Sequence, residues 1–327
     1  RALLRRGSAL FFPFIYNHLF WIFSTAWLLL PHNHLKTFNR GCILLHMQEL
    51  DINAKDGWVF DLDGVIYNGS EEIAGASDLI HFLEANGKKC MYLTNNSTKS
   101  RKSYVRKLAT FGIDAPVDAI YTSAVITAEW LQEHCNGAKK SIFVIGESGL
   151  KEELTLAGFS VVDEGHFDGD DLDSFKCIDF VVVGLDTNLT YRKLFIALNC
   201  IKQGAKFIAT NDDNTLPLEG GLIGPGTGSI IQALVNCSKK QPELGSPFGK
   251  PNPIALEGIL QTLDMEKSRI IVVGDRPETD ILVANNAGID TILVLSGITK
   301  DASMVPEDCK PTVILGSVKE ILKLVQN

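Results

Sequence analysis

Residues 58–65 read Trp58-Val59-Phe60-Asp61-Leu62-Asp63-Gly64-Val65. The apolar residues predict a short buried strand, and Gly64 lets the backbone turn sharply after it. Asp61 and Asp63 then lie at the carboxyl end of the strand, where open α/β sheets bind their ligands. Two such carboxylates can bind a hard cation such as Mg²⁺, although an isolated motif of this kind could equally be a helix cap and a turn. The meaning of this candidate site therefore depends on the rest of the chain.

Short apolar runs alternate with amphipathic segments along most of the chain. This alternation predicts an α/β fold with a doubly wound parallel sheet. The expected strands of the main sheet are 58–60, Cys90–Leu93, Ala119–Thr122, Arg269–Val273 and Thr291–Leu295. The expected helices are Ala76–Ala85, Lys99–Phe111, Ala124–His134, Ile254–Leu263 and Val318–Val325.

A second series of strands and helices begins after the turn at Asn136-Gly137. Its expected strands are 141–145, 180–183 and 206–209, and its expected helices are 150–157 and 191–203. The acidic, glycine-containing stretch Asp163–Asp173 predicts a solvated loop, and so do the Gly- and Pro-rich residues 211–227. The glycine-rich run 224–229 lacks the Gly-Lys-Ser/Thr ending of a P-loop. We interpret this run as a turn into a helix that begins near Ser229.

Polar residues recur where strands of the main sheet end or helices begin. They are Asp61 and Asp63; Thr94, Asn95 and Asn96; Lys250; and Asp275 and Asp280. The carboxyl ends of parallel strands share one edge of a sheet, so these groups can converge. Carboxylates with a cation, a lysine and hydroxyl or amide donors suit phosphoryl transfer, whose transition state spreads charge over three equatorial oxygens. The local alternatives are helix capping by residues 94–96 and a helix-start acid for Asp280.

The composition is that of a globular protein. The chain has 327 residues, 45% of them hydrophobic and 21% charged, which is long enough for two domains. A net charge of −8 without a basic stripe argues against nucleic acid as a partner. The seven cysteines are scattered without a CxxC motif, so we expect reduced thiols and neither a zinc site nor a disulfide framework.

The N-terminal residues allow three interpretations. Residues 9–30 carry no charge and as a helix would be about 33 Å long, enough to cross a bilayer. The absence of acidic residues before Glu49 also fits a targeting peptide. Alternatively, residues 1–48 are an extension foreign to the native protein, with Met47 as the initiator. We expect a cytoplasmic protein, with organelle targeting or membrane anchoring through residues 9–30 as the alternatives.

Taken together, the motifs resemble those of the haloacid dehalogenase (HAD) superfamily of aspartyl phosphatases. The matching stretches are Asp61-Leu62-Asp63-Gly64-Val65, Leu93-Thr94-Asn95-Asn96-Ser97, Gly249-Lys250-Pro251-Asn252-Pro253 and Gly274-Asp275-Arg276-Pro277-Glu278-Thr279-Asp280. The chain looks most like the branch that contains 4-nitrophenyl phosphatase, phosphoglycolate phosphatase and pyridoxal phosphate phosphatase. The resemblance runs from about Gly57 to the C-terminus. It implies a Rossmann-like HAD core with an inserted α/β cap of the C2, NagD-like type.

The resemblance also implies roles for the aspartates. Asp61 would be the nucleophile that forms an aspartyl-phosphate. Asp63 would protonate the leaving alkoxide and then deprotonate the attacking water. Mg²⁺ would bind Asp61, the backbone carbonyl of Asp63, and Asp275.

The remaining motif residues would bind the phosphoryl group. The resemblance implies that Thr94 and Lys250 hold its oxygens, with help from Asn95 and Asn96. Asp280 would orient the lysine or the waters of the metal.

Spacing places the implied cap. Only 30 residues separate Asp63 from Thr94, which leaves room for a helix and not for a domain. The long interval before Lys250 therefore contains the cap, residues 137–243. The core is then 49–136 with 244–327, preceded by the hydrophobic extension 1–48. The cap would close over the pocket and select substrates, and a homodimer through the cap is one expected assembly.

Substrate choice is expected to reside in the cap loop 211–219, with Asp212, Asp213 and Leu216 as candidates. This loop looks more like that of the phosphoglycolate phosphatases, because pyridoxal phosphate enzymes are expected to carry a histidine where Leu216 stands. We favour a small acidic phosphomonoester, phosphoglycolate first, with 4-nitrophenyl phosphate as an artificial substrate. Asp212 and Asp213 would repel a substrate carboxylate unless they point away or pair with a cation.

Other substrates and two other functions compete with this interpretation. A nucleoside monophosphate or pyridoxal phosphate is the alternative substrate. A phospho-acceptor or binding module without turnover is the non-enzymatic alternative, although such a module would have no need of Asp63. A dehalogenase would lack Asp63 and the metal aspartates.

Overall fold

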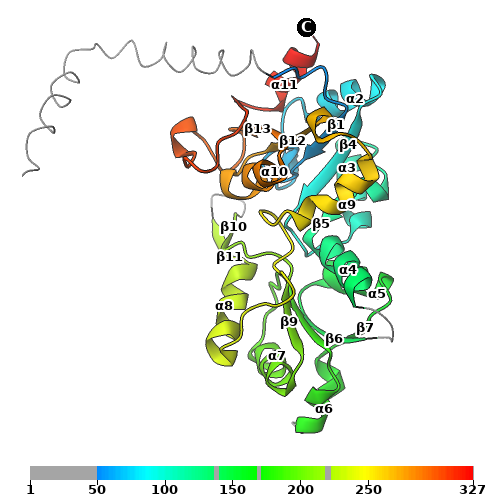
Figure 1. Cartoon of the computed structure of the whole chain (residues 1–327), viewed down its shortest axis with the longest axis vertical. Helices are drawn as coiled ribbons and strands as arrows, with labels where there is room; N and C mark the ends of the chain where they lie inside the picture. The colour runs from blue at the N-terminus through cyan, green and yellow to red at the C-terminus, as the bar shows by residue number, and fades with distance from the viewer. Residues whose placement is uncertain (1–49, 136–139, 168–170, 218–221, 327) are drawn as a thin grey trace, which may run out of the picture. The chain divides into compact units, whose positions relative to one another are not determined.

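The computed structural model describes residues 50–135, 140–167, 171–217 and 222–326. Two parallel sheets, one of six strands and one of four, organise this part of the chain (Figure 1). The N-terminal residues 1–48, with the apolar stretch 9–30, lie outside the described residues, as does the turn at 136–137. Within the described ranges, no helix combines the length and the apolar character needed to cross a membrane.

The six-stranded sheet has the strand order β14-β13-β12-β1-β4-β5, and all its pairings are parallel. Its strands are β1 (Gly57–Phe60), β4 (Lys89–Thr94), β5 (Ile120–Thr122), β12 (Ile270–Gly274), β13 (Asp290–Val294) and β14 (Val313–Leu315). The accompanying helices are α2 (Ala76–Ala85), α3 (Arg101–Ala109), α4 (Ser123–His134), α9 (Ile254–Leu263), α10 (Leu282–Ala287) and α11 (Val318–Val325). All residues of β1 and β12 are buried, as expected for parallel strands whose two faces are both covered. The predicted α/β class with a doubly wound parallel sheet is confirmed.

The strand order brings the predicted motifs together. β1 lies between β12 and β4, with Phe60 beside Val273 on one side and beside Tyr92 on the other. The Asp61 N–H continues this pairing and donates to the Val273 carbonyl at 2.9 Å. Because all three strands end at the same edge, the residues that follow them are neighbours in space although they are distant in sequence.

The second sheet has the order β7-β6-β8-β9 and is also parallel. Its strands are β6 (Ser141–Ile145), β7 (Ser160–Val162), β8 (Phe180–Val183) and β9 (Lys206–Ala209), with helices α5 (Ser148–Leu156), α6 (Leu172–Lys176), α7 (Tyr191–Gln203) and α8 (Thr227–Ser238). All four strands lie inside the interval 137–243, whose assignment to a cap domain stays a prediction.

Successive side chains of β6 join different apolar clusters. Ile142 and Val144 belong to the same buried cluster as the residues of the six-stranded sheet, whereas Phe143 and Ile145 pack with α7 and α8 in a second cluster. This alternation follows from the two-residue period of a strand. One face of the second sheet therefore contributes to the core that the six-stranded sheet also builds.

Short elements depart from the predictions. The stretch 211–227, expected to be a loop, contains the antiparallel hairpin of β10 (Thr215–Pro217) and β11 (Ile223–Pro225). Gly226 then leads into α8, and any Cβ on it would overlap the Asp213 carbonyl, so the glycine serves close packing. The glycine-rich run does lead into a helix as interpreted, but Gly224 and Pro225 belong to β11 and the helix begins at Thr227, before the expected Ser229. The strands β7 and β14 were not predicted from the sequence. The remaining short elements are β2 (Tyr67–Asn68), β3 (Glu71–Glu72), η1 (Val117–Ala119), η4 (Lys267–Arg269), η5 (Pro277–Ile281) and η6 (Ala302–Met304).

The prediction of a solvated loop at 163–173 is only partly right, because most of its described residues are exposed but Glu164–Phe167 form a short helix. A short helix, η2 (Glu164–Phe167), ends in Phe167, whose side chain is only 1% exposed. Its ring packs edge-on against Phe143 at 5.5 Å and stacks on Phe175 at 5.4 Å. One aromatic side chain buried by packing with other elements thus outweighs the polar character of its neighbours.

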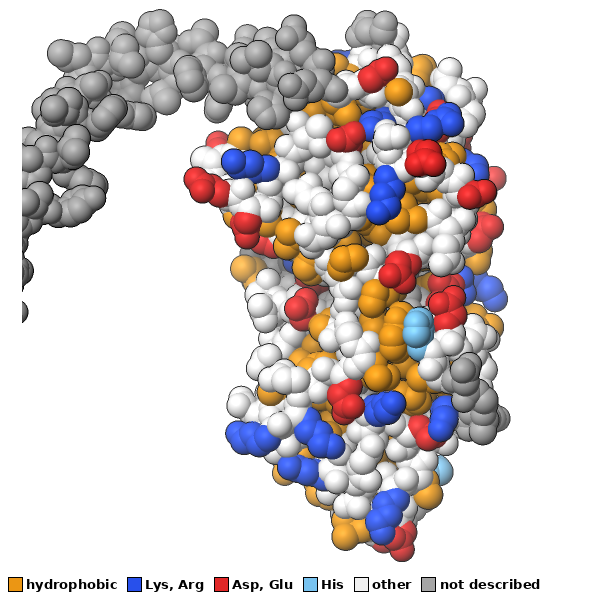
Figure 2. Space-filling view, viewed as in Figure 1, with side chains coloured by type: hydrophobic (Ala, Val, Ile, Leu, Met, Phe, Trp, Pro, Cys, Tyr) orange, Lys and Arg blue, Asp and Glu red, His pale blue; other side chains and the backbone are white. Residues whose placement is uncertain are grey.

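Charged side chains of both signs are scattered over the face shown in Figure 2. Lys and Arg are interspersed there with Asp and Glu. This distribution provides no single-sign field of the kind that attracts a polyanion to such a face.

We expect Phe167→Ala to lower the free energy of unfolding by about 3–5 kcal/mol, because it leaves a cavity between Phe143 and Phe175. Urea denaturation followed by circular dichroism measures the change. Leu172→Ala is the control, since Leu172 is 57% exposed and its loss should change stability by no more than about 0.5 kcal/mol. Equal stabilities of the two variants would contradict the packing role of Phe167.

Candidate active site

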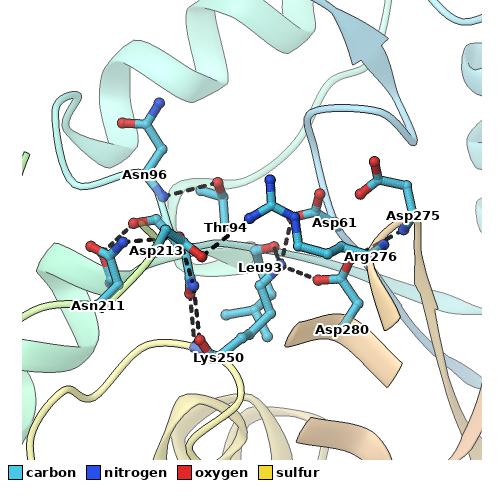
Figure 3. A network of polar contacts seen from close by, with 12 residues as sticks. Asp61, Leu93, Thr94, Asn96, Asn211, Asp213, Lys250, Asp275, Arg276 and Asp280 are labelled. Carbon is cyan, nitrogen blue, oxygen red and sulfur yellow. Dashed lines mark hydrogen bonds and ion pairs between the residues drawn. The ribbon is translucent and has the colours of Figure 1, made fainter. Parts of the chain in front are cut away.

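Lys250 is the central residue of the site (Figure 3). Its Nζ lies 2.6 Å from Asp61 Oδ1 and 2.6 Å from Asp280 Oδ1, and it donates to the Leu93 carbonyl at 3.1 Å. The side chain is only 4% exposed. Burial opposes the charge on Lys250, but the two carboxylates outweigh it and raise the pKa of the lysine. Lys250 is therefore a permanent buried cation at the end of β1 and β4.

Three carboxylates gather beside this lysine. Asp61, Asp275 and Asp280 each offer an oxygen, and these oxygens lie within 4.8 Å of one another. Burial raises the pKa of Asp61 well above its usual range, with Asp280 and Asp275 adding to the effect and Lys250 opposing it. Burial, helped by Asp280, raises the pKa of Asp275 to about 6. The surroundings of Asp61 and Asp275 therefore disfavour the ionised form of each carboxyl group.

Asp280 is fully engaged by the protein. Its Oδ2 accepts hydrogen bonds from the main-chain N–H groups of Asp275 and Arg276 at 3.1 and 3.0 Å, while its Oδ1 faces Lys250. Gly274 permits this arrangement, because a Cβ there would overlap the Asp280 side chain. Asp280 thus fixes both the lysine and the turn that presents Asp275.

Asp63 lies in the turn after β1 and remains in contact with solvent. The surrounding protein removes enough water to raise its pKa, against the opposing effects of Lys107 and the Tyr67 hydroxyl. The Lys107 ammonium lies 3.2 Å from the centre of the Tyr67 ring. Asp63 is thus a carboxyl group with a raised pKa that solvent can reach.

Residues 94–96 follow β4 and differ in their surroundings. The Thr94 hydroxyl accepts from the Asn96 N–H at 3.2 Å. The Asn95 side chain binds the main chain of Lys250 in both directions, donating to its carbonyl at 2.9 Å and accepting from its N–H at 2.8 Å. The Asn96 side-chain oxygen accepts from Thr98, and Figure 3 shows the Asn96 side chain turned away from Lys250. The Thr94 side chain is thus bonded to the main chain of its own loop, whereas the Asn95 side chain holds the main chain of Lys250.

The segment after β9 contributes Asp213 to the site, while Asp212 beside it is exposed. Asp213 Oδ2 accepts from Asn95 and Asn211, at 3.1 and 2.9 Å, and Oδ1 pairs with Arg276 at 3.3 Å. Leu216 is half-buried in β10, paired with Gly224 of β11. Leu218 and Glu219, at the end of the predicted loop, lie outside the described residues.

Two parts of the site were not predicted from the sequence. Arg276 was quoted within a motif but given no role, and it proves to be the ion-pair partner of Asp213. The loop after β13 was missed, although the Ile298 N–H donates to Asp275 Oδ2 at 2.5 Å. A Cβ on Gly297 would overlap the Asp275 carboxylate. Ser296-Gly297 directly after a strand on the same sheet edge was the signal that could have revealed this loop.

Comparisons with known proteins agree with this geometry. Residues 58–160 match the family model of haloacid dehalogenase-like hydrolases, and residues 247–321 match a second, HAD-hydrolase-like model. An acid sugar phosphatase of Staphylococcus saprophyticus is 38% identical over 266 residues, which cover 81% of this chain and 96% of that protein.

Solved structures show the same relationship. A 4-nitrophenylphosphatase from Thermotoga maritima has a TM-score of 0.74 and 33% identity, covering 84% of this chain and 98% of its own. A putative nagD protein has a TM-score of 0.71 and 32% identity, covering 84% of this chain and 99% of its own. With this identity and coverage added to the motifs at one sheet edge, the chain belongs to the haloacid dehalogenase superfamily, in its NagD-like branch.

Proposed function

We propose that the protein is a Mg²⁺-dependent phosphomonoester hydrolase that works through an aspartyl-phosphate on Asp61. The observation that supports this most is the 2.6 Å contact between Lys250 Nζ and Asp61 Oδ1, beside Asp275 and Asp280. A nucleophilic carboxylate, a fixed cation and an acidic pair at one strand edge are the elements that phosphoryl transfer uses. Relatives that are named phosphatases support the same reaction class.

The proposed chemistry has two steps. In the first, an Asp61 carboxylate oxygen forms a bond to phosphorus while the phosphorus–oxygen bond to the alcohol breaks, and Asp63 gives its proton to the leaving oxygen. In the second, water attacks the phosphorus and returns a proton to Asp63. The bond to Asp61 then breaks and inorganic phosphate leaves. Lys250 and the Thr94 hydroxyl stabilise the charge on the phosphoryl oxygens.

The residues present suit a Mg²⁺ ion. Asp61, the backbone carbonyl of Asp63, and Asp275 would hold it through oxygen atoms, the ligands that Mg²⁺ prefers. Burial, with a smaller contribution from neighbouring carboxylates, raises the pKa of Asp61 and of Asp275, and a cation held by their oxygens would favour the ionised form of both. When bound, the ion would neutralise phosphoryl charge. Asp280 has both oxygens engaged by Lys250 and by main-chain N–H groups, so it acts by orienting the lysine.

We propose a small acidic phosphomonoester as the substrate, with phosphoglycolate first and phosphates of acid sugars next. The acid sugar phosphatases among the relatives support an acidic substrate. The ion pair with Arg276 balances Asp213, which removes one of the two carboxylates that would repel such a substrate. The apolar Leu216 supports neither pyridoxal phosphate nor any other ligand that needs a ring hydrogen bond at that position. Pyridoxal phosphate and nucleoside monophosphates are the competing substrates.

A phosphate-release screen over these phosphomonoesters, with and without Mg²⁺, tests the proposal. We expect turnover that requires Mg²⁺ and is lost in excess chelator, with 4-nitrophenyl phosphate as the reporter. Asp61→Asn should lower kcat at least about 1,000-fold, the scale of losing a catalytic nucleophile, with an unchanged circular dichroism spectrum. Release of a single equivalent of product would instead indicate a phospho-acceptor without turnover, and full activity in chelator would refute the metal.

Asp63→Asn separates the two roles of Asp63. Its effect on the burst of alcohol release should be small for 4-nitrophenyl phosphate, whose leaving group needs no acid, and large, at least about 100-fold, for an alkyl phosphate. Rapid-quench measurement of the burst gives both rates. Equal losses for the two substrates would show that Asp63 does not protonate the leaving group.

Gly297→Ala tests the support of Asp275. The added methyl group would displace the Asp275 carboxylate, so we expect a loss of about 10–100-fold in Mg²⁺ affinity or activity, as for other groups that orient metal ligands. The measurement is kcat as a function of Mg²⁺ concentration. Gly165→Ala is the matched control, because Gly165 is exposed and its added Cβ would meet only the Asp163 side chain at 3.3 Å. Identical Mg²⁺ curves for the two variants would count against Asp275 as a ligand.

A further inference from the structure

Asp213 follows a strand of the second sheet, yet two of its partners, Asn95 and Arg276, follow strands of the six-stranded sheet. It follows β9 in the segment 211–214, and its side chain is 17% exposed. One oxygen accepts from Asn95 and Asn211, and the other pairs with Arg276. With both oxygens bound by protein donors, this carboxylate is poorly placed to recognise a substrate.

Asn95 connects Asp213 to Lys250. Its side-chain NH₂ group donates to Asp213 Oδ2 and to the Lys250 carbonyl, and its oxygen accepts from the Lys250 N–H. The orientation of this amide is therefore fixed from both sides. Without the Asp213 carboxylate, the Asn95 side-chain amide would lose one of the hydrogen bonds that fix its orientation toward the Lys250 main chain.

Arg276 connects Asp213 to the other end of the site. Its guanidinium pairs with Asp213, while its main-chain N–H donates to Asp280 Oδ2. Asp280 in turn contacts Lys250 Nζ. The interactions therefore close a ring through Asp213, Asn95, Lys250, Asp280 and Arg276.

The segment that carries Asp213 is itself well anchored. The Gly249 N–H donates to the Thr210 carbonyl at 2.7 Å, which joins the residue before Lys250 to the end of β9. Asp213 is thus held in a defined position relative to Lys250 and does not depend on a bound substrate to reach it.

We propose that Asp213 is a positioning residue for the reaction, which holds Lys250 through Asn95 and the Asp275 turn through Arg276. The second sheet would then complete the phosphoryl site for every substrate, in addition to any role in selecting one. This inference rests on the proposed hydrolase function, but its structural part can be measured without turnover.

Asp213→Asn in the full chain tests the proposal, because the new NH₂ group would face donors on Asn95 and Asn211 or on Arg276. We expect kcat for 4-nitrophenyl phosphate and for phosphoglycolate to fall by the same factor, at least about 10-fold, the scale of losing a hydrogen bond to a charged group, with KM nearly unchanged. Asp173→Asn is the control, since it removes the same charge from an exposed pair with Lys176 elsewhere on this part of the chain. A loss confined to one substrate, or to KM, would overturn the proposal by making Asp213 a substrate contact.

Hydrogen exchange of the substrate-free protein gives the second readout. Asp213→Asn should accelerate exchange in the peptide that contains Gly249 and Lys250 by about 10-fold, because local opening becomes easier when their partners are loosened. Asp213→Glu, which keeps the charge, should show a smaller change of the same kind if Asp213→Asn folds poorly. Exchange equal to that of wild type would refute the positioning role. Faster exchange in a protein that hydrolyses no phosphomonoester would uphold the positioning of Lys250 and reject the hydrolase function.

Discussion

The site depends on one buried ammonium group. Moving a charge out of water costs several kcal/mol, and only well-placed partners of opposite sign offset that cost. Lys250 finds them in Asp61 and Asp280, with the Leu93 carbonyl as a third acceptor. Since Asp61 follows β1, Leu93 lies near the end of β4 and Asp280 comes after β12, the lysine can remain buried only if those three strands are adjacent and in register. The electrostatics of the site and the strand order of the sheet therefore constrain each other.

Packing around the buried ammonium group and its carboxylate partners explains why uncharged residues such as glycine occupy certain nearby positions. Gly274 and Gly297 lack the Cβ atoms that would overlap Asp280 and Asp275. The main-chain N–H groups of Arg276 and Ile298 then reach those carboxylates directly. Hydrogen bonds of this kind fix an acidic side chain without adding a second cation. Asp275 and Asp280 are consequently held in place by main-chain donors.

The sequence predicted those features of the fold that follow from the periodicity of apolar residues. Buried strands and their polar C-terminal residues were recognisable, and parallel topology alone required Asp61, Thr94 and Asp275 to share an edge. The sequence does not show which hydrogen-bond partner a polar side chain has in the fold. The hydrogen bonds between the Asn95 side chain and the Lys250 main chain could therefore not be predicted. Short elements such as β7, and Phe167 in η2, are stabilised by residues distant in sequence, and their own sequences give little sign of them. Propensity is a weak guide wherever tertiary packing decides.

The charge distribution explains why the site calls for a divalent cation under the proposed function. Asp61, Asp275 and Asp280 face a single ammonium group, and the nearby guanidinium of Arg276 is already paired with Asp213. A phosphate monoester would bring still more negative charge into this surplus. Close charges interact strongly where water is excluded, so repulsion would outweigh the attraction of Lys250. Two additional positive charges, bound by Asp61 and Asp275, would reverse that balance and allow the nucleophile and the phosphoryl group to approach each other.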